Sequence, residues 1–138
     1  MIRARRVLAV LGAAAAAACG ERSTTGVKTP DTSVTAATVA LATPNANDGA
    51  IVVTLNGPDV AAVQAADSHY IVFTKLVSAQ EARVIVIGNL VAGPLFTVRL
   101  GNPHALSAYS GAIQQVATRS DSIVANTGGY QLTVSAPQ

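Results

Sequence analysis

The chain contains few cysteine, aromatic and charged residues. Of its 138 residues one is cysteine, none is tryptophan, 4% are aromatic and 12% are charged. The cysteine is Cys19, so no disulfide can form within the rest of the chain, and an exported domain there must be held by its core alone. From residue 19 onward there are six Lys and Arg against seven Asp and Glu, a net charge of −1. A nucleic-acid-binding protein needs a dense cationic surface to neutralise phosphates, so nucleic acid is not an expected partner.

The first eighteen residues have the layout of a secretory signal peptide. Three arginines (Arg3, Arg5 and Arg6) precede an apolar stretch over residues 7–18 that ends in six alanines. A helix that spans a membrane needs about 20 apolar residues, and this stretch is shorter. A positive start, a short apolar segment and small residues at its end predict a leader over residues 1–18 that is removed on export.

The sequence at the end of this leader is Ala16-Ala-Ala-Cys19-Gly20. It resembles the lipobox of bacterial lipoproteins, in which small residues precede an obligatory cysteine. The resemblance implies that the Cys19 thiol receives a diacylglycerol and that the chain is held on a membrane of the bacterial cell envelope through its lipid. Gly20 in place of Asp implies the outer membrane, where the organism has one. The alternative is ordinary secretion with cleavage after Ala18, which would leave Cys19 without a role.

The segment after Cys19 is predicted to be a tether. Residues 20–33 are polar and rich in Thr, Ser and Gly, and residues 34–43 are either an edge strand or more tether. A dense cluster of turn residues follows over 44–49. The expected organisation is therefore a signal peptide over 1–18, a lipidated tether over 19–44 and one folded domain over 45–138.

Within this domain short β-type runs alternate with Gly, Pro and Asn turns. The run over 95–100 alternates cleanly, with Phe96, Val98 and Leu100 on one side, as a half-buried strand does. Residues 60–66 fit a short helical turn or a loop, and residues 109–119 fit a strand better than a helix. The pattern predicts an all-β fold, a small antiparallel β-sandwich. The six predicted strands cover residues 51–56, 70–77, 82–88, 95–100, 109–119 and 130–135.

The succession of strands and Gly-containing turns from Gly57 to Val134 resembles, in pattern, the small exported sandwiches of the cohesin and carbohydrate-binding-module type. This resemblance implies a binding module and transfers no binding residue. It adds no catalytic, metal-binding or cofactor-binding position.

Each group of residues that could form a catalytic or metal-binding site is better explained by a structural role. Asp67-Ser68-His69 contains the residue types of a hydrolytic triad, but adjacent residues cannot converge as a triad must. His69 and His104 are far apart in sequence and lack the closely spaced ligands typical of zinc sites. Asn45, Asn47 and Asp48 fit a turn better than a calcium loop. We therefore predict no catalytic centre, no metal and no cofactor.

The aromatic residues separate two hypotheses for function. A carbohydrate-binding face would need Tyr70, Tyr109 or Tyr130 to form an exposed row, whereas a domain this small needs most of its aromatics in the core. Tyr70 and Phe73 differ by three positions and so lie on opposite faces of one strand. Either one of them marks an exposed patch or the strand is covered on both faces.

The sequence thus predicts a non-enzymatic module of the cell envelope that binds another protein or a surface component. Its partners would be the membrane, through the lipid anchor, and another envelope protein or a surface glycan. One alternative is a carbohydrate-binding module. A further alternative is a small hydrolase, which would require a deep pocket that unites His69 or His104 with an acid and a hydroxyl group.

Overall fold

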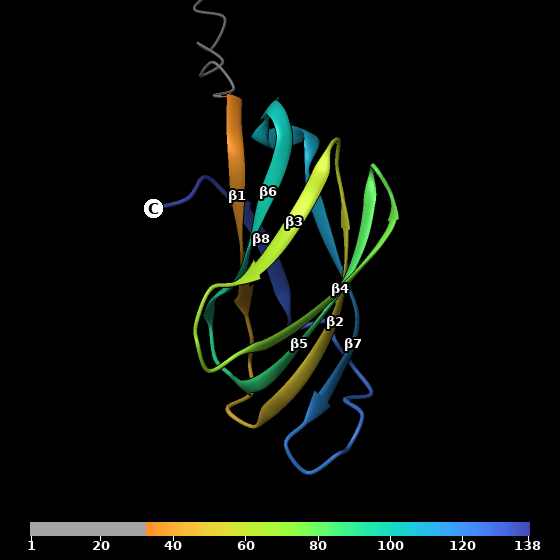
Figure 1. Ribbon diagram of the computed structural model, residues 1–138. Helices are drawn as coiled ribbons and strands as arrows, with labels where there is room; N and C mark the ends of the chain where they lie inside the picture. Colours follow the sequence, from red (N-terminus) through yellow and green to blue (C-terminus); the bar gives the residue numbers. More distant parts are fainter. Residues whose placement is uncertain (1–32) are drawn as a thin grey trace, which may run out of the picture.

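The computed structural model describes residues 33–138 (Figure 1). The predicted leader, Cys19 and the first part of the tether lie outside these residues. Within them the chain forms strands connected by turns, with one short 3-10 helix, Leu106–Ala108 (η1). The strands are Ser33–Ala42 (β1), Asp48–Asn56 (β2), Val60–Ala65 (β3), Ile71–Ser78 (β4), Glu81–Leu90 (β5), Gly93–Ala105 (β6), Ser110–Thr118 (β7) and Gln131–Ser135 (β8).

The strands form two antiparallel sheets of four strands each. One sheet has the order β3-β6-β1-β8 and the other has the order β4-β5-β2-β7. In Figure 1, β1, β6 and β3 lie together, and the lower part of the molecule is made by β2, β5 and β7. The protein is therefore an all-β antiparallel sandwich, as the sequence predicted.

The core lies between the two sheets and follows the alternation of the strands. In β6, Phe96 and Val98 are fully buried and Leu100 nearly so, while Arg99 faces solvent. The predicted inward side of this strand is confirmed. The opposite sheet contributes the inward residues of its central strands, which are Ile51, Val53 and Leu55 from β2 and Ala82, Val84 and Val86 from β5.

The prediction for the segment before residue 45 needs correction. Residues 33–42 are neither tether nor an edge strand, because β1 lies inside its sheet with β6 on one side and β8 on the other. Its inward residues Ala37, Val39 and Leu41 are buried. The outward positions 36, 38, 40 and 42 carry three alanines and one threonine, so polar and apolar residues do not alternate clearly. Pairing with two neighbours fixes the strand. The sandwich therefore begins at Ser33 and not at residue 45.

The structure also decides the secondary structure of two segments that the sequence left open. Residues 60–65 form an edge strand paired with β6, and not a helical turn or a loop. Its alternation is weak because an edge strand of this sheet leaves most side chains in solvent, and only Val60 is buried. The segment around residues 109–119 is a strand, as predicted, and it pairs with β2.

Candidate functional site

The three tyrosines do not form an exposed row. Tyr109 and Tyr130 are buried, and Tyr70 is half-buried against the core. Each of the three stands one position before a strand and closes a turn, where its N–H donates to the carbonyl three residues earlier. Tyr109 and Tyr130 therefore cannot belong to the exposed aromatic row that a carbohydrate-binding face would need.

Two of these rings need a glycine beside them. A Cβ at Gly57 would lie 2.1 Å from Cδ1 of Tyr109, and one at Gly88 would lie 2.8 Å from Cδ1 of Tyr70. Real Cβ atoms do not approach other heavy atoms so closely. The glycines therefore make the room in which these tyrosines pack, so these two rings serve the packing of the sandwich.

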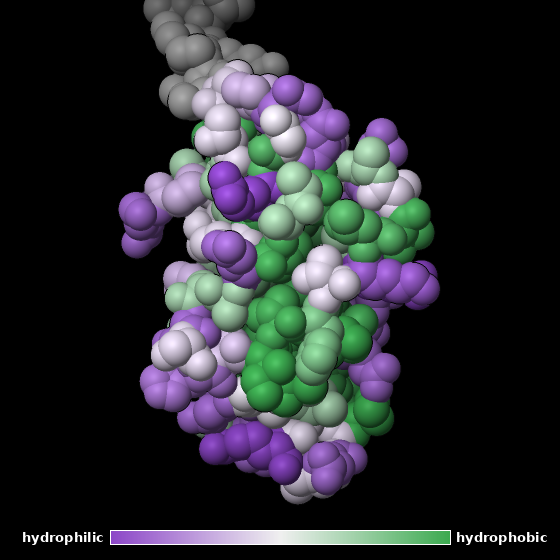
Figure 2. All heavy atoms as spheres, in the orientation of Figure 1, coloured by the Kyte–Doolittle hydropathy of each residue, from purple (hydrophilic) through white to green (hydrophobic). Residues whose placement is uncertain are grey.

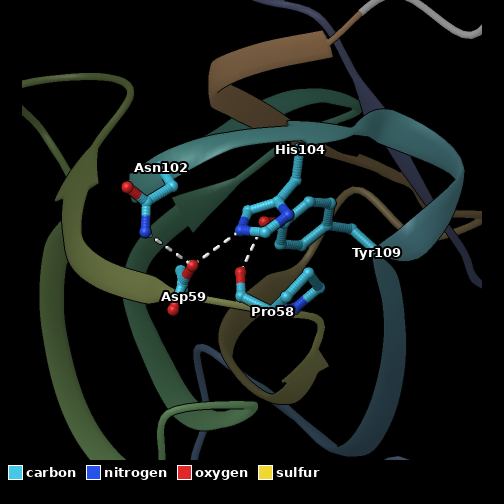
Figure 3. A network of polar contacts seen from close by, with 5 residues as sticks. All are labelled: Pro58, Asp59, Asn102, His104 and Tyr109. Carbon is cyan, nitrogen blue, oxygen red and sulfur yellow. Dashed lines mark hydrogen bonds and ion pairs between the residues drawn. The ribbon is translucent and has the colours of Figure 1, made fainter.

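A polar cluster joins the turn after β2 to the far end of β6 (Figure 3). The Asp59 carboxylate accepts a hydrogen bond from Asn102 Nδ2 at 3.0 Å and lies 2.7 Å from Nε2 of His104. The hydroxyl of Tyr109 donates to the carbonyl oxygen of Pro58. The hydrogen bonds from Asn102 and His104 lower the pKa of Asp59 below its ordinary value.

This cluster pairs a histidine with an acid, but its hydroxyl group is already engaged. The Tyr109 hydroxyl points to the backbone of Pro58, and His104 meets the Tyr109 ring edge-on with ring centroids 6.5 Å apart. Asp59 has φ 51°, a left-handed conformation that side-chain hydrogen bonds help an aspartate adopt. The arrangement fixes the β2–β3 turn against β6 and the start of β7, so we interpret its role as structural.

The other histidine lies on the surface. His69 Nδ1 is 2.6 Å from Oδ1 of Asp67, and its side chain is 85% exposed. The same carboxylate oxygen accepts the His69 backbone N–H at 2.8 Å, a hydrogen bond that closes a turn before β4. These hydrogen bonds lower the pKa of Asp67. The Asp67–His69 segment thus forms a solvated turn.

The residues that resemble a calcium loop are engaged in hydrogen bonds within the protein. Asp48 is completely buried, and its carboxylate accepts from the hydroxyls of Thr43 at 2.5 Å and Tyr130 at 2.9 Å. Arg119 donates to Oδ1 of Asn47 and to the carbonyl of Ala46, both at 3.0 Å. Among residues 33–138, no three His, Cys, Asp or Glu side chains are grouped closely enough to hold a metal ion.

The sheet β4-β5-β2-β7 has an unusually apolar outer side. Four large apolar side chains of β4 and β5 face solvent there, and Ile71 and Phe73 are 58% and 57% exposed. Cross-strand pairing aligns them in rows, because directly opposite residues of antiparallel strands point to the same side. One row runs across the whole sheet and beyond it, through Ile71, Ile87, Ala50, Ala117 and Ile123.

A second row lies beside the first and is formed by Phe73, Ile85 and Val52. We call the two rows together the outer apolar face. Figure 2 shows hydrophobic residues gathered over β4 and β5. Large contiguous apolar patches are uncommon on monomeric proteins and mark sites of interaction, so this face is the strongest candidate site on the part of the chain that is described.

The next row along the strands changes character. Lys75 of β4 lies directly opposite Arg83 of β5, and Thr54 of β2 follows. Beside these cations the surface is hollowed into a depression of about 310 Å³, lined by Val52, Phe73, Thr74, Lys75, Arg83 and Ile85. The outer apolar face therefore has a cationic end.

Sequence reasoning identified one sign of this site. The spacing of Tyr70 and Phe73 required one of them to face outward or the strand to be covered twice, and the structure exposes Phe73 while Tyr70 packs on the core. The contribution of β5 was missed. Its run Val84-Ile-Val-Ile87 is apolar on both sides, and the sequence does not indicate that only one side is covered.

Comparison with known proteins adds no assignment. No protein-family model, no curated protein and no solved structure matches this chain. In the stretch that the structure describes, no helix has the length and apolar character needed to cross a membrane.

Proposed function

We propose that this protein is an exported, lipid-anchored module of the bacterial cell envelope that is not an enzyme and binds another protein. The observation that carries the binding function is the outer apolar face, with Ile71, Phe73, Ile85 and Ile87 open to solvent on two neighbouring strands. Burying one such side chain contributes about 1.5–3 kcal/mol, so a partner that covers the face gains substantial affinity. Anchoring rests on the lipobox-like sequence at Cys19.

A protein suits this face better than a surface glycan. Sugar rings stack on exposed aromatic side chains, and the outer apolar face has one aromatic residue, Phe73, among aliphatic neighbours. Aliphatic and aromatic side chains together form the centre of many protein–protein interfaces. The face also includes β4, which among the strands of residues 33–138 is an edge strand of its sheet.

The binding function is tested with a peptide library displayed on phage and selected on the purified full chain. We expect selected peptides to bind at least tenfold more weakly to Phe73→Ser, because the substitution removes the largest exposed side chain of the face. Val91→Ser is the matched control, since Val91 is 52% exposed but lies in the turn between β5 and β6. Equal loss in both variants, or no loss in Phe73→Ser, would contradict the proposal.

Anchoring has a separate test. Replacing Cys19 with serine removes the thiol that would carry the diacylglycerol, and two or more acyl chains are needed for stable membrane attachment. We expect complete loss of labelling by a radioactive or clickable fatty acid, retention of the leader, and unchanged folding of residues 33–138. Fatty-acid labelling that persists in Cys19→Ser would refute the lipid assignment.

A further inference from the structure

The cationic end of the outer apolar face indicates the chemistry of the partner. Lys75 and Arg83 are directly opposite each other on neighbouring strands, where like charges destabilise a sheet. Within residues 33–138 neither side chain forms an ion pair with an acid. Glu81 lies two positions before Arg83 on the same side of β5, and it forms no ion pair with Arg83 either. Two adjacent cations are thus left without a paired anion.

The same two cations line the depression that Phe73 and Ile85 also line. A group that enters this depression meets positive charge on one side and apolar side chains on the other. We propose that the depression receives a carboxylate of a partner polypeptide, an Asp or Glu side chain whose neighbouring apolar side chains cover the outer apolar face. This inference rests on the proposed function and specifies the partner of the same face.

The rows of the sheet set the spacing within such a partner. Successive rows are two residues apart along the strands, or about 7 Å. The acid should therefore lie about 7 Å from the apolar side chain that covers Phe73 and Ile85, and about twice as far from the one that covers Ile71 and Ile87. In an extended segment that runs along the strands, this spacing corresponds to an acid followed by apolar residues two and four positions away.

An anionic membrane fits the same face less well. A bilayer presents its negative charges as a layer, so cations should surround the apolar surface that contacts it. Here two adjacent cations, Lys75 and Arg83, lie at one end. At the other end, a second depression is lined by Ile87, Gly88, Arg119 and Asp121. The cation there, Arg119, donates hydrogen bonds to Asn47 and Ala46, and Asp121 lines the same depression, so an acid would lie close to the negative lipid. The unequal charge at the two ends of the outer apolar face favours a partner that carries one acid at a defined place.

The test uses the phage selection on the full chain, followed by matched synthetic peptides. We expect the selected sequences to combine an Asp or Glu with at least two large apolar residues. Replacing the acid of a selected peptide with its amide should weaken binding to the wild-type chain about fivefold, and added salt should reduce this difference. In the Lys75→Gln, Arg83→Gln double variant, the acidic peptide and its amide should bind equally.

Arg99→Gln is the matched control, because Arg99 is an exposed arginine of β6 in the other sheet and also has no ion pair in the described part of the chain. It should keep the fivefold preference. Selected peptides that lose affinity in Phe73→Ser but show no preference for the acid would overturn the carboxylate site and leave the proposed function standing. Failure to select any peptide would contradict both. Binding to phosphatidylglycerol vesicles through Lys75 and Arg83, without an acidic preference among peptides, would also overturn the proposal.

Discussion

Replacing Val98 with aspartate is expected to abolish the folded state. Val98 lies at the centre of β6, is fully buried, and faces Ala37 of β1 and Val63 of β3 across the strands. A carboxylate at this position would have no cation to pair with and would cost several kcal/mol. The total stability of a domain is about 5–15 kcal/mol, and this chain has no disulfide between its sheets to offset the loss.

The measurement is thermal unfolding followed by circular dichroism, with the dispersion of amide proton signals as a second observable. Arg99→Asp introduces the same side chain at the next position of the strand, where it faces solvent, and it should change stability by less than about 1 kcal/mol. Cooperative unfolding of Val98→Asp at the wild-type midpoint would show that the inward side of β6 is assigned wrongly.

The second large effect is expected at Asp48, the buried polar side chain of the core. Its carboxylate accepts hydrogen bonds from Thr43 and Tyr130, and Nδ2 of Asn45 donates to the Tyr130 hydroxyl at 2.6 Å. Replacing Asp48 with alanine leaves the Tyr130 hydroxyl without its acceptor, removes the shorter of the two hydrogen bonds that the Thr43 hydroxyl donates, and opens a small cavity. We expect a loss of about 2–4 kcal/mol in the free energy of unfolding.

A double-mutant cycle distinguishes the hydrogen bond from the cavity. Tyr130→Phe should cost less in the Asp48→Ala background than in the wild type, because the hydroxyl it removes is then already unsatisfied. Asp121→Asn serves as the control, since Asp121 is an exposed aspartate whose φ of 59° asparagine also adopts, and removal of its charge should change stability by about 0.5 kcal/mol or less. Additive effects of Asp48→Ala and Tyr130→Phe in urea titrations would contradict the coupling.

The network at Asp48 also explains one pKa. Burial, followed by the hydrogen bond to Asp48, raises the pKa of Tyr130 above its ordinary value. The sequence placed Asp48 in a turn with Asn45 and Asn47, which is where its chain neighbours lie. It gave no indication that the side chain turns inward to a tyrosine more than eighty positions later.

Strand alternation in the sequence was sufficient to predict the fold class and the inward side of β6. It failed at Ser33–Ala42 and Val60–Ala65 for different physical reasons. In the first segment the outward positions carry mostly alanine, which weakens the alternation, and pairing with β6 and β8 determines the structure. The second is an edge strand whose side chains are mostly exposed. In both cases the tertiary neighbours decide, and local propensity does not reveal them.

The outer apolar face likewise could not be predicted without knowing the tertiary neighbours of its strands. The sequence shows that residues 71–73 and 84–87 are apolar at every second position and in between, which is typical of strands covered on both faces. Only the two-layer architecture leaves the outward residues Ile71, Phe73, Ile85 and Ile87 open to solvent. The pairing of Lys75 with Arg83 likewise follows from the register of β4 and β5.

The position of β1 inside its sheet also bears on when the protein can fold. Its two neighbours, β6 and β8, come from much later in the sequence. During synthesis β1 therefore emerges from the ribosome long before the strands that complete its backbone hydrogen bonds. Structures dominated by such distant pairings fold slowly. The sheet that contains β1 therefore cannot be completed before β8, the last strand of the chain's described part, has been made.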